Sequence, residues 1–371
     1  MNAVSAFFRF FRTYTTRFFR VCLVLLLGCG CLLLLSIVSP TVADALNRTV
    51  CHGVRVGLGT LTSLVPFSVG ELLLFLIPTA LTFAVVWLFV RSHDRASRIR
   101  VISSVLAIGC LAAAMQTLTL GIAYRATPLE QRLSLTPEGA TAEELLSVAE
   151  HLRDEAHALL DEITFDENGS SVMPYDTDTL SDKLMDAYAR VEQDYPDAVY
   201  GFTSRIKPVV ASRVMSYAHI IGVYTFFSGE SNLNVDYPDY NFPFTSAHEF
   251  AHQRGVAPEE AANFMAHLVC IASDDAYIRY SGYANLLVYV MNAYYRAVAD
   301  ADVYATFYYS VDERLRGEFH AESVHSQQYD TAFGELSSDL NDLYLKANGT
   351  EGRVSYGFVV DLAVAFYKDV E

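Results

Sequence analysis

The stretch FPFTSAHEFAHQRGVAPEEAANF, residues 242–264, contains an HExxH sequence in which two histidines are four positions apart. Residues with that spacing lie one above the other on one face of a helix. The imidazoles of His248 and His252 can therefore both reach one zinc ion at about 2.0–2.1 Å. Glu249 lies about 100° further round the helix, where it can face a metal-bound water instead of the metal. The spacing predicts a helical metal site.

The local sequence also predicts where this helix begins and ends. Pro243 and the polar residues after it are typical of a helix start, which we expect near Ser246. Gly255 is typical of a helix end, and it permits the sharp turn that would bring the next helix back. That second helix is expected from Pro258 to about Ser273.

A catalytic zinc site has three protein ligands and keeps a fourth position open for water. Glu259 and Glu260 begin the second helix, and either carboxylate could complete the site. Helix residues one apart face differently, so only one of the two is expected to bind the metal. Zinc lowers the pKa of bound water, and Glu249 would act as the general base that takes its proton.

Each of these residues also has an ordinary structural interpretation. Ser246 and Glu249 have the spacing of a capping box. Glu259 and Glu260 could be acidic first-turn residues that complement the helix dipole, and the histidines could be surface or core residues. Their joint occurrence within twelve residues favours the metal site.

Further candidates lie along the second helix. Asn263, one turn beyond Glu259, could support the ligands or be a polar residue on a helix face. His267 lies another turn on; it is a fallback ligand, although its position favours a packed histidine. Late in the chain, Tyr356 could bring a phenol to the site as an oxyanion stabiliser or be a core tyrosine.

Glu230, Asn232 and Asn234 alternate just before the motif. Alternate residues share one face of a strand, so these side chains could line a cleft along a strand edge that holds an extended peptide. The competing interpretation is a solvated loop.

Three apolar segments are long enough to cross a bilayer, at about residues 21–39, 72–90 and 101–124. The arginines flanking them predict a cytoplasmic amino terminus and an extracytoplasmic region after Arg125, because cytoplasmic loops are rich in basic residues. These arginines are Arg9, Arg12, Arg17, Arg20, Arg91, Arg95, Arg98 and Arg100. Alternatively, the first segment is a signal cleaved near Ala43-Asp44-Ala45, but its apolar stretch is long for a signal.

The charge divides the chain at the same point. After Arg125 lie 15 of the 26 Lys and Arg and 40 of the 43 Asp and Glu, a formal net charge of −25. That charge argues against binding nucleic acid and against docking on anionic lipid. We therefore expect a membrane anchor at residues 1–125 and a separate extracytoplasmic domain at residues 126–371. The six cysteines of the whole chain show no disulfide framework.

Most of the expected domain has helical periodicity. A capping box at Thr141 and Glu144 begins one helix, and one or two short strands are expected around residues 219–227, which are β-branched and aromatic. The other expected helices cover residues 179–193, 283–299, 329–345 and 354–368.

Two segments carry a resemblance to a known family. FFSGESNLNVDYPDYNFPFTSAHEFAHQRGVAPEEAANF (residues 226–264) and LYLKANGTEGRVSYG (residues 343–357) resemble a bacterial membrane-protein family, domain of unknown function 3810. The resemblance implies a zincin-like metal site but supplies no substrate. Residues 259–263 also resemble the E-x-x-A-[DN] pattern of other HExxH peptidases, which makes Glu259 the third ligand. The spacing departs from many of those enzymes, in which the glutamate lies further from the second histidine.

These observations predict a mainly α protein: three N-terminal transmembrane helices, then a largely helical, zincin-like extracytoplasmic domain with a small β-sheet. The leading hypothesis is a membrane-anchored zinc metallopeptidase whose partners are the lipid bilayer and a peptide or protein substrate outside it. The alternative is a non-catalytic envelope protein, a scaffold or sensor, with a structural zinc or no metal.

Overall fold

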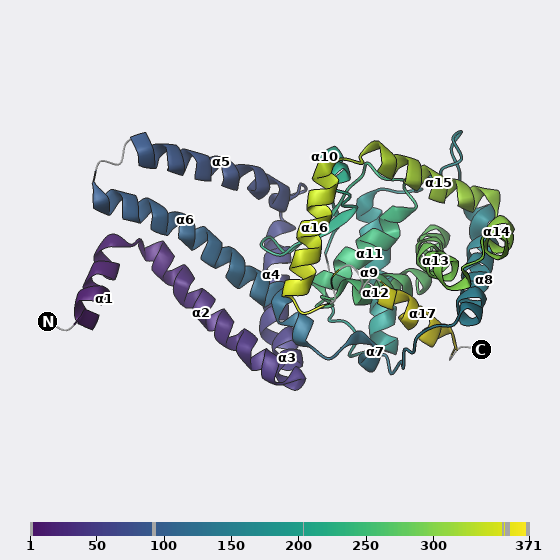
Figure 1. The fold of residues 1–371 in the computed structure, drawn as a ribbon, viewed down its shortest axis with the longest axis horizontal. Helices are drawn as coiled ribbons and strands as arrows, with labels where there is room; N and C mark the ends of the chain where they lie inside the picture. The colour runs from purple at the N-terminus through teal and green to yellow at the C-terminus, as the bar shows by residue number, and fades with distance from the viewer. Residues whose placement is uncertain (1–2, 91–93, 203, 351, 353–356, 369–371) are drawn as a thin grey trace.

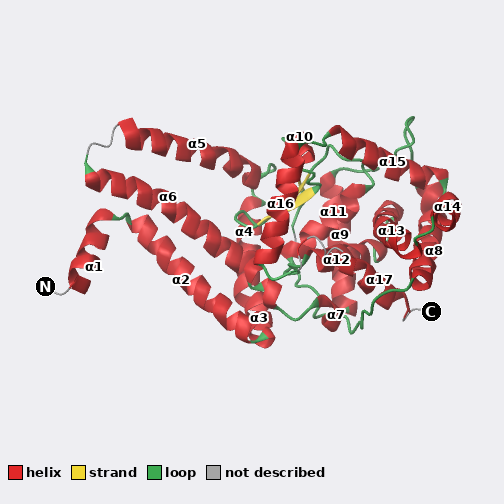
Figure 2. Cartoon of the chain, viewed as in Figure 1, coloured by secondary structure: helices red, strands yellow, loops and turns green. Residues whose placement is uncertain are grey.

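The computed structural model describes residues 3–90, 94–202, 204–350, 352 and 357–368. Long helices extend from one side of a helical body, and the carboxy terminus lies at the far end of that body (Figure 1). Helices dominate, and one small sheet lies inside the body (Figure 2). The expected mainly α class is confirmed.

Among the residues that the structure describes, three helices are long and apolar enough to cross a membrane: Arg17–Val38, Val69–Val90 and Arg95–Gly121. The first two are α2 and α5, and the third is α6 (Arg95–Gln116) continued by the π-helix η2 (Thr117–Gly121). A short helix, α1 (Ala3–Tyr14), precedes them. All three expected apolar segments are therefore long helices. The third helix ends at Gly121, and Tyr124 lies in the 3-10 turn η3 (Ala123–Arg125) that follows it.

The segment between the first two long helices is itself helical, which the sequence analysis did not predict. It forms α3 (Pro40–Leu46), the π-helix η1 (Asn47–Cys51) and α4 (His52–Thr62). It packs against the body, since Lys207 donates to the carbonyl of Thr62 at 2.6 Å. Arg55 is fully buried and donates to the carbonyls of Asn47 and Thr119, 3.0 Å away in each case.

The body contains eleven α-helices among the described residues, and the predicted capping box of Thr141 and Glu144 begins one of them. They are α7 (Leu129–Arg132), α8 (Ala142–Leu159), α9 (Thr177–Asp194), α10 (Ser212–Tyr217), α11 (Asn241–Gln253), α12 (Glu259–Ile271), α13 (Ala276–Val298), α14 (Ala301–Ser310), α15 (Glu313–Gln328), α16 (Ala332–Ala347) and α17 (Phe358–Lys368). Four of them, α7, α10, α14 and α15, were not predicted. In α15, Arg314, Glu318 and His320 interrupt the apolar periodicity that identifies an amphipathic helix.

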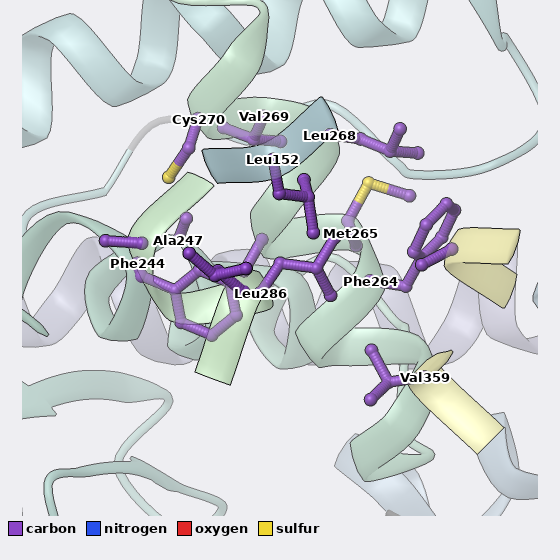
Figure 3. Packing of buried hydrophobic residues seen from close by; sticks show 14 of the residues in the cluster. Leu152, Phe244, Ala247, Phe264, Met265, Leu268, Val269, Cys270, Leu286 and Val359 are labelled. Carbon is purple, nitrogen blue, oxygen red and sulfur yellow. The ribbon is translucent and has the colours of Figure 1, made fainter. Parts of the chain in front are cut away.

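Four helices meet in the core, and Figure 3 shows their side chains interdigitating. Leu152 of α8, Phe244 of α11, Met265 of α12 and Leu286 of α13 are all buried there. Each such side chain contributes about 1.5–3 kcal/mol through burial. This packing fixes α11 and α12 side by side, and these are the two helices that carry the predicted ligands.

The sheet has three strands in the order β1-β3-β2. The central strand β3 (Glu230–Leu233) is parallel to β1 (Lys207–Pro208) and antiparallel to β2 (Gly222–Thr225). The strand expected within residues 219–227 is therefore present as β2, which packs against α11.

Candidate metal centre

Helix α11 begins at Asn241, five residues before the predicted start at Ser246. Pro243 is tolerated in the first turn because the amides there have no partner within the helix. Ser246 consequently lies in the helix interior and is buried. The capping-box interpretation of Ser246 and Glu249 is wrong, since neither residue lies at the helix start.

His248, His252 and Glu259 form a group that could hold one metal ion, with one ligand atom from each lying within 4.8 Å of the others. The Nε2 atom of His248 lies 3.2 Å from Oε2 of Glu259, and Nε2 of His252 lies 3.6 Å from Oε1. Two ligands of a tetrahedral zinc ion, each at about 2.0–2.1 Å, are separated by about 3.3 Å. The observed separations are close to that value, so the donor set fits zinc.

The ring of His252 is oriented by a hydrogen bond on its other nitrogen. Nδ1 lies 2.8 Å from the carbonyl oxygen of Val256, which can only accept, so Nδ1 carries the proton. Nε2 therefore faces the centre of the group, where a metal ion that displaces its proton would bind its lone pair. The rings of His248 and His252 are perpendicular, with centroids 4.7 Å apart.

A tight turn at Gly255 places α12 beside α11. Its φ of +90° suits glycine, as predicted. The amide of Val256 donates to the carbonyl of Ala251 at 3.0 Å, which closes the turn. On its outer side, Asn47 donates from Nδ2 to the carbonyl of Gly255 at 2.9 Å. The segment between the long helices thus contacts the turn that joins the ligands.

Glu249 lies beside the three-ligand group without belonging to it. Its side chain is buried against β2 and accepts a hydrogen bond from the backbone amide of Tyr224. The approach is close: a Cβ atom at Gly222 would lie 2.6 Å from Oε1 of Glu249. Burial raises the pKa of Glu249. A carboxylate held in this way has a fixed position and an increased affinity for a proton.

The two glutamates therefore have opposite electrostatic environments. Burial alone would raise the pKa of Glu259, but His252 and His248 outweigh it and lower that pKa. Burial would also lower the pKa of His252, but the Glu259 carboxylate raises it to about 9. Glu259 is thus held as an anion, which suits a metal ligand, whereas Glu249 is adjusted to accept a proton.

A sequence profile described as "Protein of unknown function (DUF3810)" matches residues 47–364. This chain belongs to the DUF3810 family. No curated protein and no solved structure matches it. The DUF3810 match begins at Asn47, in η1, so it includes the segment that contacts Gly255 as well as the metal group.

Two other predicted residues of this DUF3810 protein, Glu260 and Asn263, stand outside the group. Glu260 follows Glu259 on α12 but is not among the three ligands. Asn263 is buried one turn further along the same helix. Tyr356 lies outside the described residues.

His267 is a packed histidine, as its position favoured. Its Nδ1 bonds the carbonyl of Gly282 at 3.1 Å, and its Nε2 bonds the hydroxyl of Tyr367 at 2.7 Å. Both nitrogens are occupied within the core, and burial lowers the pKa of His267 to about 4. Its role as a fallback ligand is not supported.

The expectation that Glu230, Asn232 and Asn234 line a strand edge is wrong, and so is the solvated-loop alternative. Glu230 and Asn232 lie on β3, the central strand, Asn234 follows it directly, and all three are buried. Glu230 pairs with Lys207 at 2.7 Å and accepts the amides of Val69 and Gly70. Glu230 therefore holds the sheet to the start of α5, whereas Asn232 donates to Oγ1 of Thr225 and Asn234 donates to the carbonyl of Ile220, both at 2.9 Å.

Sequence reasoning missed the aromatic residues around the group. The ring of Tyr224 lies 6.5 Å from that of His252. Tyr124 and Tyr344, whose rings are 6.5 Å apart, both lie close enough to Glu259 for its charge to affect them. Contacts between such distant parts of the chain leave no local sequence pattern that could reveal them.

Proposed function

We propose that this protein is a membrane-anchored, zinc-dependent peptidase. One observation carries the proposal: one ligand atom from each of three side chains lies within 4.8 Å of the others, and a buried carboxylate lies beside them without joining them. A hydrolytic site needs both the ligands and a separate base, whereas a structural site needs only ligands.

In this proposal, His248, His252 and Glu259 hold the ion. A zinc ion in such a site supplies a Lewis acid that acidifies water and polarises a carbonyl. Glu249 accepts the proton and passes it to the leaving amine. Its raised pKa helps it to retain the proton between these steps.

The outer strand of the sheet supports a polypeptide substrate. Among the described strands, β2 lies at one side of the sheet, pairs only with β3, and contacts Glu249 through Tyr224. An extended peptide could add to its open edge through backbone hydrogen bonds, which would place a peptide carbonyl near the base.

A structural zinc site is the competing class. Such sites usually close the fourth position with another His or Cys. Within the described ranges, the group around His248 contains three candidate ligands, and Cys270, eleven residues beyond Glu259 on α12, is buried in the core. We therefore favour catalysis, on the side of the membrane opposite the arginine-rich helix ends.

The test uses the full chain in detergent, loaded with zinc, with metal content and cleavage of an unfolded protein pool both measured. Glu249→Gln should keep the metal and the fold but lose activity by roughly 10²–10⁴-fold. Glu259→Gln should lose both metal and activity. Equal cleavage by Glu249→Gln and wild type would refute the proposed base. A zinc-loaded wild type that cleaves nothing would favour the scaffold.

A further inference from the structure

The end of the third long helix packs directly on the metal centre's immediate supports. Leu120 and Ala123 form a small buried cluster with Tyr224 and Ala257. Tyr224 flanks the ring of His252, and Ala257 lies in the turn between α11 and α12. The metal centre therefore lies one layer of side chains from the end of this helix.

The length of the third long helix indicates where this buried cluster lies relative to a bilayer. A hydrocarbon core needs about 20 helical residues, and the last arginine at the other end of α6 is Arg100. Counting about 20 residues from Arg100 reaches Leu120. The cluster around Leu120 would then lie at the boundary between hydrocarbon and headgroups.

The second long helix gives an independent measure. Its 22 residues, Val69–Val90, span about 33 Å at 1.5 Å per residue, close to one hydrocarbon core. Its first amides, at Val69 and Gly70, bond the carboxylate of Glu230 at 3.0 and 2.6 Å. Ser231, which follows Glu230 on β3, donates from its hydroxyl to the carbonyl of Glu249 at 3.1 Å. Both helices therefore end at the elements that hold the site.

Helix α16 has an apolar face that the body does not cover. Phe333, Leu336, Leu340 and Leu343 lie on one side at helical spacing and are 51%, 54%, 58% and 64% exposed. The helix runs across the direction of α2, α5 and α6, at the border between them and the body (Figure 1). This is the arrangement of an amphipathic helix that lies in a membrane interface.

Two contacts fix α16 at the level of the helix ends. Gln116, the last residue of α6, donates to Asn348, which caps α16, at 3.4 Å. Tyr344 of α16 faces Tyr124, which follows the third long helix. Ala123, the residue before Tyr124, packs with Tyr224 and Ala257, so this aromatic pair follows directly on the buried cluster beside the candidate ligands. Tyrosines are common at membrane interfaces.

We infer that the substrate is a polypeptide held at the membrane and cut close to the lipid surface, with the exposed face of α16 immersed in the interface. The inference rests on the proposed peptidase function. A site one packed layer from the hydrocarbon boundary, on the order of 10 Å, is reached by about three residues of an extended tethered chain at about 3.3 Å per residue. A peptide bond many residues from the membrane anchor would not be held near the candidate metal centre by that anchor.

The first arm measures depth without using activity. The chain has one tryptophan, Trp87. A Trp87→Phe protein carrying Leu340→Trp is placed in liposomes whose lipids have brominated acyl chains, and the matched control carries Tyr309→Trp, an exposed position on α14. We expect strong quenching at position 340 and little at 309. Equally weak quenching at both positions would overturn the inference.

The second arm compares one peptide in three forms in proteoliposomes: lipid-anchored with a short spacer, lipid-anchored with a long spacer, and free. The short-spacer form should be cleaved with a kcat/KM roughly 10-fold or more above the others. Equal cleavage of all three forms would overturn the membrane-held substrate and leave the peptidase proposal intact. Cleavage of none by zinc-loaded protein would overturn both, even if position 340 is quenched.

Discussion

His252 donates its Nδ1 proton to the carbonyl of Val256, 2.8 Å away, and this leaves its Nε2 facing Glu259. The acceptor belongs to the turn that begins α12, so the same few residues orient a ligand on one helix and position the ligand on the next. The geometry of the candidate metal centre therefore depends on this turn as much as on the helix that carries the HExxH sequence.

The third ligand is tested by paired glutamate variants. Glu259→Gln removes a carboxylate that lies 3.2 Å from His248 and should weaken zinc retention more than the roughly 10–100-fold expected for an outer-shell partner. Glu260→Gln, one residue along, should have little effect. Zinc content after dialysis against a chelator measures both. The reverse order would assign the role to Glu260.

The turn is tested at Gly255. Gly255→Ala combines a φ of +90° with a Cβ that would lie 2.7 Å from the guanidinium of Arg55. Gly169→Ala is the matched control, since φ is +82° and nothing lies within 4 Å. We expect the control to lose about 1–2 kcal/mol of stability from strain alone, and Gly255→Ala to lose more and to retain less zinc. Equal losses in thermal unfolding would show that the close contact is unimportant.

A pH dependence of stability should arise at Glu318. Burial raises the pKa of Glu318 to about 7, above its unfolded value, so the folded state binds the proton more tightly. This stabilisation is full below about pH 4.5 and is lost as pH rises through 7, by about 3 kcal/mol. Glu318→Gln should flatten the dependence between pH 5 and 8 and unfold at a higher temperature than wild type at pH 8. An unchanged pH profile would refute this assignment.

The membrane topology can be tested with reporters fused at the carboxy terminus. The arginine-rich ends of the long helices predict that this terminus is extracytoplasmic. A reporter active only in the cytoplasm should be silent there, and one active only outside should give signal. Cytoplasmic activity would contradict the orientation and with it a substrate on the outer side. A fusion after Asp94, between α5 and α6, should give the opposite result.

The sequence predicted what depends on local periodicity. The three apolar helices, the helical body and the spacing of His248, His252 and Glu259 all follow from patterns a few residues long. Its errors lie where tertiary contacts decide. Polar character suggested exposure for Glu230, but Lys207 and the start of α5 neutralise that carboxylate within the core. Ser246 has the spacing of a cap, yet the aromatic residues before it pack in the core and extend the helix.

The buried guanidinium of Arg55 has a consequence for how the protein is made. Its hydrogen-bond acceptors are the carbonyls of Asn47 and Thr119. The turn at Gly255, which packs over the guanidinium, follows Arg55 by about 200 residues in the chain. At 5–20 residues per second, the ribosome needs roughly 10–40 s to supply that turn. During this interval the long helices can insert into the membrane, and the guanidinium of Arg55 remains hydrated at the membrane surface. The ligand-bearing turn would then fold onto a surface that has already been assembled, and a fragment starting after the third long helix would lack that template.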